Sequence, residues 1–216
     1  MKSLVVLPNW VGDTVLALPV VDALAAADRH LAVLGRPHLG PLLQSQSSID
    51  SFVPRSESDG ATIDRIRQAG FEEAVVLPNS IRSAKLTRQA AIPSRFGYGG
   101  RSAEGLVRRV LLNPAVADRR ERHRHQVEDY ADLLAAMEVP APSAWLPQLE
   151  LTPAQLRVGQ ELLGRANLDP DRPLIGLFAG AEFGPSKRWP LKRFVELAQA
   201  LRRQIPGCQL AILAGP

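Results

Sequence analysis

The sequence predicts an α/β fold built on a parallel, doubly wound sheet. Short apolar runs alternate with stretches in which apolar residues recur at helical spacing along most of the 216 residues. Alternation of this kind is typical of βαβ units, whose strands lie parallel to one another. The clearest runs are continuous rather than alternating polar with apolar, as expected of strands that helices cover on both faces.

Strands in the first part of the chain are expected at residues 3–7, 31–34, 51–53, 73–77 and 95–98. Helices are expected at 14–27, 37–44, 63–69, 81–90 and 127–137. Pro19 would cost the first helix a hydrogen bond, and Gly70 is expected to follow the third helix at the C′ position. Residues 98–109 combine glycines with three arginines, so we expect a mobile basic loop there.

A second βαβ unit is expected after a linker. Three prolines fall within residues 139–147, and Thr152 followed by Pro153 is typical of the start of a helix. A strand at 174–178, a loop at 180–190, a helix at 194–205 and a strand at 209–214 form the unit. The sequence therefore predicts a first domain at 1–139, a linker at 140–152 and the beginning of a second domain at 153–216.

The loop at 180–190 is the strongest candidate for a ligand site. It lies at the carboxyl end of a strand, which is the edge of an open parallel sheet where ligands bind. Glycines there allow backbone N–H groups to approach an anion, and Lys187 adds a full positive charge. Only four of the 26 basic residues are lysines, so a lysine in this loop is informative. The pattern predicts a seat for a diphosphate.

Composition restricts the class of protein. Apolar residues make up 45% of the chain, which is enough for a packed core, and the longest apolar runs are far shorter than a membrane span. The N-terminus enters an apolar strand without a signal-peptide pattern, and Cys208 is the only cysteine. A cytoplasmic protein without disulfides or thiolate-rich metal sites is therefore expected.

The basic character allows several kinds of partner. The net charge is +4 and the pI is about 9.7, which suits nucleic acid, an anionic membrane surface or an acidic substrate. Aromatic residues make up only 5% of the chain, and no basic stripe is interleaved with aromatics. Binding of nucleic acid is therefore not expected.

Three motifs stand in order along the chain. They are Pro8-Asn9-Trp10-Val11-Gly12-Asp13, then Val76-Leu77-Pro78-Asn79-Ser80-Ile81-Arg82-Ser83-Ala84, then residues 180–190. Together they resemble the lipopolysaccharide heptosyltransferases of glycosyltransferase family 9, and most closely the heptosyltransferase II type. The segment from Ile92 to Asn113 is also similar to that family, so the resemblance covers essentially the whole chain.

The resemblance implies a GT-B enzyme, with two Rossmann-like domains facing each other across a cleft. The N-terminal domain would receive the acceptor, the heptosyl-Kdo2-lipid A inner core of lipopolysaccharide, and the C-terminal domain would hold ADP-heptose. Family members transfer heptose with inversion, generally without a dedicated metal, so no cofactor is expected. Contact with the cytosolic face of the inner membrane is also implied, because the acceptor is embedded there.

The family's catalytic residues match two positions. Asp13 matches the proposed base, and Lys187 matches the phosphate-binding lysine, which supplies positive charge as the leaving diphosphate becomes more negative. Asp13 precedes a helix, so the alternative is that it is simply the N-cap. Six residues are expected to bind the donor: Gly180, Ala181, Glu182, Phe183, Ser186 and Lys187.

Acceptor recognition is expected around the first two motifs. Arginine forks suit bidentate contacts with carboxylates and phosphates, although a solvated helix face is the alternative for these cations. The expected acceptor-binding residues are Gly12, Asn79, Ser80, Arg82, Lys85 and Arg101. The basic run at 119–125 is interpreted as surface, with attraction to anionic lipid as the alternative, and no metal site is expected.

The sequence departs from the family's pattern at its C-terminal end. It stops at Gly215-Pro216, directly after the second strand of the donor domain, and lacks the family's later nucleotide-binding segment. We therefore expect an incomplete copy with little transferase activity by itself. Two alternatives stay open: a non-catalytic module that binds anionic sugars or the lipopolysaccharide core, and a family 9 transferase with a different donor or acceptor.

Overall fold

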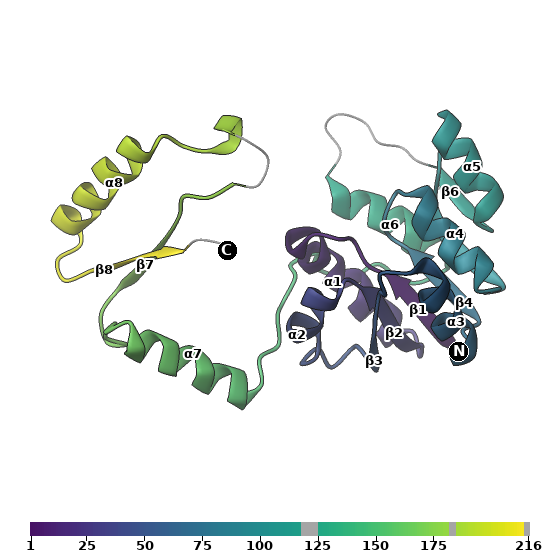
Figure 1. The fold of residues 1–216 in the computed structure, drawn as a ribbon, viewed down its shortest axis with the longest axis horizontal. Coiled ribbons are helices and arrows are strands. Elements are labelled where there is room, and N and C mark those ends of the chain that lie inside the picture. The colour runs from purple at the N-terminus through teal and green to yellow at the C-terminus, as the bar shows by residue number, and fades with distance from the viewer. Residues whose placement is uncertain (118–124, 182–184, 214–216) are drawn as a thin grey trace. The chain divides into compact units, whose positions relative to one another are not determined.

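The computed structural model describes residues 1–117, 125–181 and 185–213 (Figure 1). The chain divides into two compact units, Met1–Leu151 and Thr152–Pro216. Both units contain parallel strands connected by helices. The α/β class that the sequence predicts is therefore confirmed.

The first unit is organised around one six-stranded sheet. Its strands have the order β3-β2-β1-β4-β5-β6, and every pairing is parallel. Leu4 in the central strand aligns with Ala32 on one side and Ala74 on the other. The strand order reverses beside β1, which creates the switch point where open α/β sheets bind ligands. The strands are β1 (Lys2–Val6), β2 (His30–Gly35), β3 (Ser51–Pro54), β4 (Glu73–Val76), β5 (Ser94–Gly99) and β6 (Ala115–Ala117).

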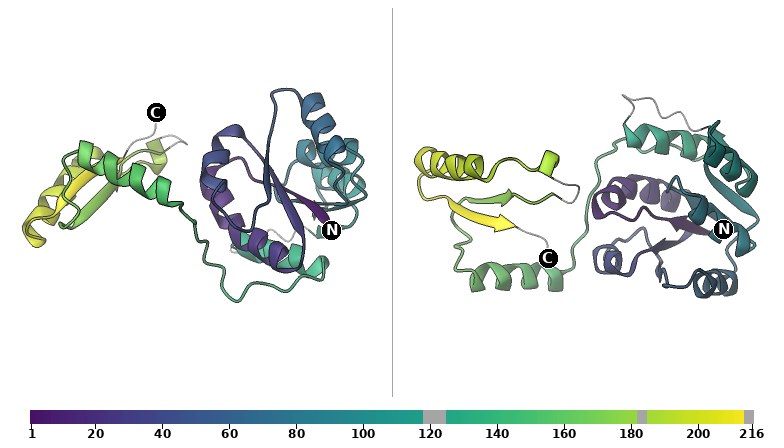
Figure 2. Two further views of the ribbon diagram at one scale, coloured as in Figure 1. Left: turned by 90° about the horizontal axis from the view of Figure 1, so that it is seen from below. Right: turned by 45° about the horizontal axis from the view of Figure 1, so that its top comes forward.

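Helices cover both faces of this sheet, because alternate residues of each buried strand point to opposite sides. Val5 packs in one apolar cluster with residues of α1 (Val11–Ala26), α2 (Gly40–Leu43) and α6 (Gln126–Ala136). Leu4 and Val6 pack in the other cluster, with residues of α3 (Asp59–Ala69) and α4 (Ile81–Gln89). Figure 2 shows the two helical layers on either side of the strands. A 3-10 turn, η1 (Pro37–Leu39), leads into α2.

Several local predictions agree with these elements. Gly70 follows α3 with φ of 67°, the left-handed conformation in which glycine avoids a steric cost. Pro19 lies inside α1, and the helix continues through it. Pro19 and the residues around it are buried in the core, and this packing outweighs the hydrogen bond that a proline removes from the helix.

The expectation of a mobile basic loop at 98–109 is wrong. Residues Ala103–Leu111 form a helix, α5. The side chain of Ser102 caps its first turn by accepting a hydrogen bond from the Gly105 N–H at 3.1 Å. Arg108, which looks in sequence like a surface cation, is buried and holds the helix against the sheet through carbonyl contacts. Strand β6 follows α5 and was not predicted, because three residues give no clear periodic signal.

The second unit is the βαβ arrangement that the sequence predicts. Its strands β7 (Leu174–Phe178) and β8 (Gln209–Leu213) pair in parallel. They are connected through a 3-10 turn, η2 (Pro185–Lys187), and α8 (Leu191–Gln204). Helix α7 (Pro153–Arg165) precedes them, and Thr152 and Gln155 form a capping box at its start. Across the part of the chain that the structure describes, no helix is long and apolar enough to cross a membrane.

The boundary between the units lies between Leu151 and Thr152, so residues 140–151 belong to the first unit. Trp145 packs against the core of that unit. Glu150 is then fastened to the loop after α2: its carboxylate accepts bonds from the Ser47 N–H and hydroxyl, both at 2.7 Å. Its carbonyl accepts a bond from the Ser45 hydroxyl at 2.6 Å. These contacts, which we call the Glu150 tether, pin the chain at the end of the first unit.

The tether leads to a pH-dependent prediction. The Ser47 hydroxyl, and then its N–H, lower the pKa of the Glu150 carboxyl below its usual value. A group whose pKa is lower in the folded state contributes stability above its unfolded pKa and loses it as the pH falls through the folded pKa. Glu150→Gln should therefore reduce the hydrogen-exchange protection of the Ser47 amide at neutral pH. The difference from wild type should shrink as the pH falls into the carboxyl's titration range.

Amide exchange resolved by NMR gives this measurement, and the Leu31 amide is a suitable reference. It is bonded to a different carboxylate, that of Asp50, at 2.6 Å, so Glu150→Gln should leave it unchanged. Equal protection of Ser47 in both proteins at neutral pH would contradict the tether.

Candidate functional site

The carboxyl edge of the first sheet carries the candidate site, and Asp13 lies beside its switch point. Asp13 is half-buried in the first turn of α1, whose N-cap is Trp10 without a side-chain capping bond. The alternative in which Asp13 is merely the N-cap is therefore wrong. The helix dipole favours a carboxylate in this turn. With the described residues, the Asp13 carboxylate forms no hydrogen bond, so it is available to an incoming group.

Ser80 lies on the other side of the switch point, after β4. Its hydroxyl oxygen accepts a hydrogen bond from the Ser83 N–H at 3.1 Å and so caps α4. The cap fixes the first turn of α4 and with it the position of Arg82. Arg82 forms a bidentate pair with Asp59, at 2.8 Å from Nη2 to Oδ1 and 2.9 Å from Nε to Oδ2. The hydrogen bonds from Arg82 lower the pKa of the Asp59 carboxyl, although burial opposes the shift.

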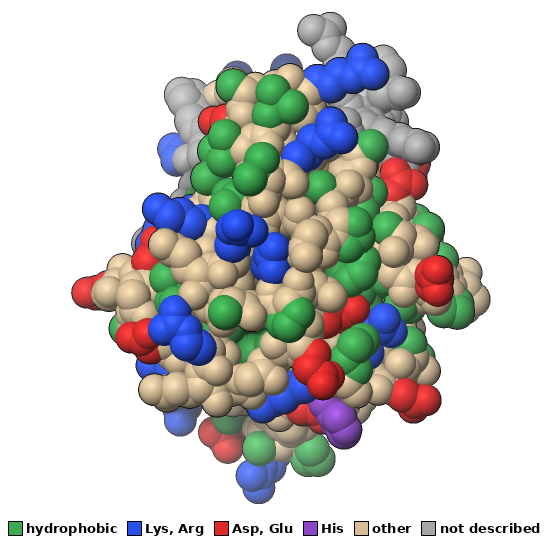
Figure 3. Space-filling view, turned by 90° about the vertical axis from the view of Figure 1, so that its right-hand side faces the viewer, with side chains coloured by type: hydrophobic (Ala, Val, Ile, Leu, Met, Phe, Trp, Pro, Cys, Tyr) green, Lys and Arg blue, Asp and Glu red, His purple; other side chains and the backbone are tan. Residues whose placement is uncertain are grey.

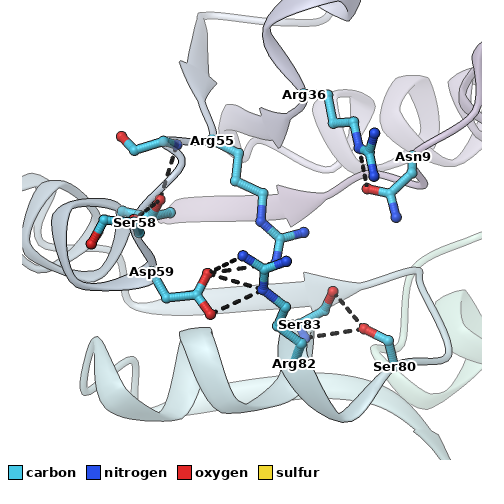
Figure 4. Close-up of polar contacts among 10 residues, drawn as sticks. Asn9, Arg36, Arg55, Ser58, Asp59, Ser80, Arg82 and Ser83 are labelled. Atoms are coloured by element: carbon cyan, nitrogen blue, oxygen red, sulfur yellow. Dashed lines mark hydrogen bonds and ion pairs between the residues drawn. The ribbon is translucent and has the colours of Figure 1, made fainter.

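A cavity of about 730 Å³ opens at this edge. The loops that follow β1, β2, β3 and β4 all contribute to it, as expected where parallel strands end together. Figure 4 shows the polar side chains that converge here. The residues lining the cavity are Asn9, Arg36, Pro37, His38, Arg55, Ser56, Glu57, Ser80 and Arg82.

The structure brings together only part of the predicted acceptor-binding set. Ser80 and Arg82 line the same cavity. Lys85 lies exposed one turn further along α4, close enough for its charge to lower the pKa of Asp59 further. Arg101 lies elsewhere, in a second cavity of about 400 Å³ beside β6. Gly12 and Asn79 are not among the lining residues of either of these two cavities.

Two arginines of the main cavity were missed from the sequence. Arg36 directly follows β2, and Arg55 directly follows β3. Arg36 donates from Nε to the Asn9 side-chain oxygen at 3.4 Å. The Nε and Nη2 atoms of Arg55 are buried and have no hydrogen-bond acceptor among the described residues. Each follows directly after a strand of a parallel sheet, and this place in the sequence is the pattern from which they could have been identified.

Crowding of like charge distinguishes Arg55. The nearest carboxylate oxygen is Asp59 Oδ1, 3.9 Å from Nη2. Burial lowers the pKa of Arg55, and the neighbouring Arg82 and Arg36 lower it too, while Asp59 raises it. Arg55 is therefore surrounded by more positive than negative charge in a partly dry position, where electrostatic interactions are stronger than in water.

Arg108 supports the loop after β4 from behind. Its Nε donates to the Tyr98 carbonyl at 3.0 Å and its Nη1 to the Asn79 carbonyl at 3.4 Å. Helix α5 thus ties the ends of β4 and β5 together. This positioning role was also missed, because Arg108 lies in the stretch expected to be a loop.

An arginine connects the two described ends of the loop in the second unit. Arg188 donates from Nε and Nη2 to the Ala181 carbonyl, at 3.3 and 3.2 Å. Lys187 ends η2 and is exposed, as is Ser186. A Cβ added at Gly180 would meet no atom of the described residues within 4 Å. The predicted donor-binding residues Glu182 and Phe183 lie outside the described residues.

Charged side chains of both signs are spread over the face of the first unit in Figure 3, and no single basic stripe crosses it. Within the described ranges, no three His, Cys, Asp or Glu side chains are grouped in a way that could hold a metal ion. His125, one of the two histidines in the predicted surface run, is exposed and caps α6. The rest of that run, residues 119–124, is not described.

Comparison with known families decides the assignment. The family model for glycosyltransferase family 9 (heptosyltransferase) matches residues 60–216. The chain belongs to glycosyltransferase family 9. The resemblance noted from the three sequence motifs is thereby confirmed.

Individual family 9 proteins support the same assignment. Lipopolysaccharide heptosyltransferase 2 of Salmonella typhimurium is 33% identical over 213 residues, which cover 93% of this chain and 60% of that protein. Its Escherichia coli counterpart is 32% identical with the same coverage. The chain thus spans about 60% of the length of these curated relatives.

Solved structures agree with the fold. The E. coli ADP-heptose lipopolysaccharide heptosyltransferase II superposes with a TM-score of 0.78 at 30% identity, over 98% of this chain and 64% of that one. A family 9 glycosyltransferase from Veillonella parvula gives a TM-score of 0.83 at 20% identity, over 100% of this chain and 62% of that one. The predicted GT-B type of fold is confirmed.

A substitution at Gly105 tests whether α5 packs closely against the first sheet. A Cβ at Gly105 would lie 2.6 Å from backbone atoms of Gly100, so Gly105→Ala should push α5 away from the sheet and loosen the Arg108 contacts. Overpacking of this kind typically costs about 1–3 kcal/mol. Urea denaturation of the first unit gives the change in the free energy of unfolding.

Gly60→Ala is the matched control, because the added Cβ at this α3 position has only an ordinary 3.5 Å neighbour. Alanine is also the better helix former, so this variant should be neutral or slightly stabilising. Equal stability of the Gly105 variant and wild type would mean that α5 does not pack as closely as described.

Proposed function

We propose that this chain forms the acceptor-binding domain and the donor-loop region of an inverting heptosyltransferase. The donor would be ADP-heptose and the acceptor the heptosyl-Kdo2-lipid A inner core of lipopolysaccharide. The observation that carries the proposal is membership of family 9, together with 33% identity to a lipopolysaccharide heptosyltransferase 2 over most of this chain. The proposed place of action is the cytosolic face of the inner membrane.

The geometry of the first unit supports the acceptor half of this proposal. Asp13 has a half-buried carboxylate at the switch point and no hydrogen bond to the described residues. Such a group is suited to remove the proton from an attacking sugar hydroxyl, and positioned general bases typically contribute about 10²–10⁴-fold in rate. The cavity of about 730 Å³ at the same edge of the sheet does not include Asp13 in its lining. It is within the usual size range of ligand pockets, roughly 300–1,000 Å³, and its arginines suit an anionic sugar.

The second unit supports the donor half. Single displacement with inversion leaves a nucleoside diphosphate whose negative charge grows as the glycosidic bond breaks. Lys187 and the backbone N–H groups after β7 supply positive potential where that charge would develop. Arg188 donates to the Ala181 carbonyl and so connects the residue directly after Lys187 to the start of the loop. No metal is required in this scheme.

Asp13→Asn tests the base. A chimera in which residues 1–216 replace the matching part of the Salmonella relative provides a chain of that relative's full length for the assay. The variant should lose about 10²–10⁴-fold in kcat, because the amide cannot accept the proton. Heptose transfer from ADP-heptose to heptosyl-Kdo2-lipid A, followed by mass spectrometry of the product, gives the rate.

Asp22→Asn is the control for this experiment, since Asp22 lies exposed on the same helix, α1, and more than two turns away. It should retain full activity. A folded chimera that transfers no heptose, or an Asp13→Asn variant with undiminished kcat, would count against the proposal.

Lys187→Ala tests the donor loop. Loss of this charge should weaken binding of ADP to the same chimera by about tenfold or more, which corresponds to a charge-assisted hydrogen bond. Isothermal titration calorimetry gives the dissociation constant. Lys192→Ala, at an exposed position in the first turn of α8, should change it little, and equal losses in both variants would mean only a general effect of charge.

A further inference from the structure

Three arginines converge in the main cavity of the first unit, and the predicted acceptor site includes only one of them. Arg36, Arg55 and Arg82 come from the loops after β2 and β3 and from the first turn of α4. We call these residues the three-arginine seat. In Figure 4 the guanidinium groups of Arg55 and Arg82 both lie beside the Asp59 carboxylate, at 3.9 and 2.8 Å.

The three arginines of the seat differ in their hydrogen-bond partners. Arg82 is paired with Asp59 by a bidentate contact, and Arg36 contacts the Asn9 side chain at 3.4 Å. Arg55 has its Nε and Nη2 buried without an acceptor among the described residues, and its side chain is only 14% exposed. A buried cationic donor without an acceptor is costly, and most such groups in proteins have a partner.

Positive charge also exceeds negative charge in the seat. The carboxylates near the three guanidinium groups are those of Asp59, which is committed to Arg82, and Glu57, which lines the cavity. Lys85 lies close enough to add positive potential at Asp59. One oxyanion placed between Arg36 and Arg55 would satisfy the buried donors of Arg55 and relieve the repulsion among the arginines.

We propose that the three-arginine seat binds an oxyanion group, a phosphate ester or a sugar-acid carboxylate, carried by the acceptor. Arg55 supplies the buried fork, and Arg36 closes the site from the β2 side. Asp59 holds Arg82 by a bidentate contact and lies 3.9 Å from Nη2 of Arg55 without forming a hydrogen bond to it. This inference rests on the proposed function for the identity of the acceptor. The anion site itself rests only on the geometry of the cavity.

Inorganic phosphate and acetate, added to the 216-residue chain at constant ionic strength, are the probes. A ligand that binds only the folded state raises the unfolding midpoint by mass action, and constant ionic strength removes general screening. Saturable stabilisation by one of the two probes is expected. Stabilisation by phosphate alone assigns a phosphate ester to the seat, and stabilisation by acetate alone assigns a carboxylate.

Two substitutions, one that removes a positive charge and one that removes a negative charge, locate the bound anion. Arg55→Gln should weaken its binding by roughly 10–100-fold, the range expected for a charge-assisted hydrogen bond. Glu57→Gln should tighten it by roughly two- to fivefold, because a competing negative charge is removed. Arg88→Gln is the matched control: it removes an exposed arginine at the other end of α4 and should leave binding unchanged.

If Arg55→Gln lowers the stability too far for titration, Arg55→Lys keeps the charge and removes only the fork. It should still lose at least about fivefold in affinity, since a bidentate contact becomes a single one. The proposal is overturned if Arg55 variants bind the anion as tightly as wild type. It is also overturned if stabilisation fails to saturate or is reproduced equally by chloride, which would indicate an adventitious ion only.

The chimera separates this proposal from the function on which it rests. Arg55→Gln should raise the KM for the acceptor and leave the KM for ADP-heptose unchanged. Normal acceptor KM in a chimera that transfers heptose would reject the seat and keep the function. Saturable, Arg55-dependent anion binding by a chain whose chimera transfers nothing would keep the anion site and reject the heptosyltransferase proposal.

Discussion

Parallel pairing of β1 with both β2 and β4 is the constraint on which the candidate site depends. Because every strand of the first sheet runs in the same direction, every loop that follows a strand opens at one edge. Asn9, Arg36, Arg55 and Ser80 are spread over some 70 positions of the sequence and yet line one cavity. The crowding of positive charge at this edge is therefore a result of topology, and no local sequence pattern reveals it.

The elements were largely predictable, because each depends on signals within a few residues. Apolar runs predicted the strands, and Gly70 predicted the end of α3. Helix α5 was missed because glycine is a poor helix former in general, whereas Gly105 is needed here for close approach to Gly100. The place of Asp13 near the start of α1 was predicted. The helix begins at Val11, so the N-cap is Trp10, three residues before Asp13.

The site was predicted less completely than the fold, for two physical reasons. Arginine is the common cation of this chain, so Arg36, Arg55 and Arg108 did not differ from surface residues in the sequence. Their environments depend on which strands are neighbours, and the sequence pattern predicts a parallel sheet but not its strand order. The loop of the second unit was easier to identify, because its strand, its glycine and its lysine follow one another closely in the sequence. Its supporting residue, Arg188, was still missed, since a contact with the Ala181 carbonyl has no local signature.

The Glu150 tether has a consequence for how such proteins exchange parts. Glu150 is the last residue fixed to the first unit, and Thr152 is already committed to the capping box of α7. Only Leu151 lies between these two anchors. A genetic crossover at that codon would separate two sets of contacts without cutting through either. Leu151 is thus the natural point for recombining first and second units from different members of the family.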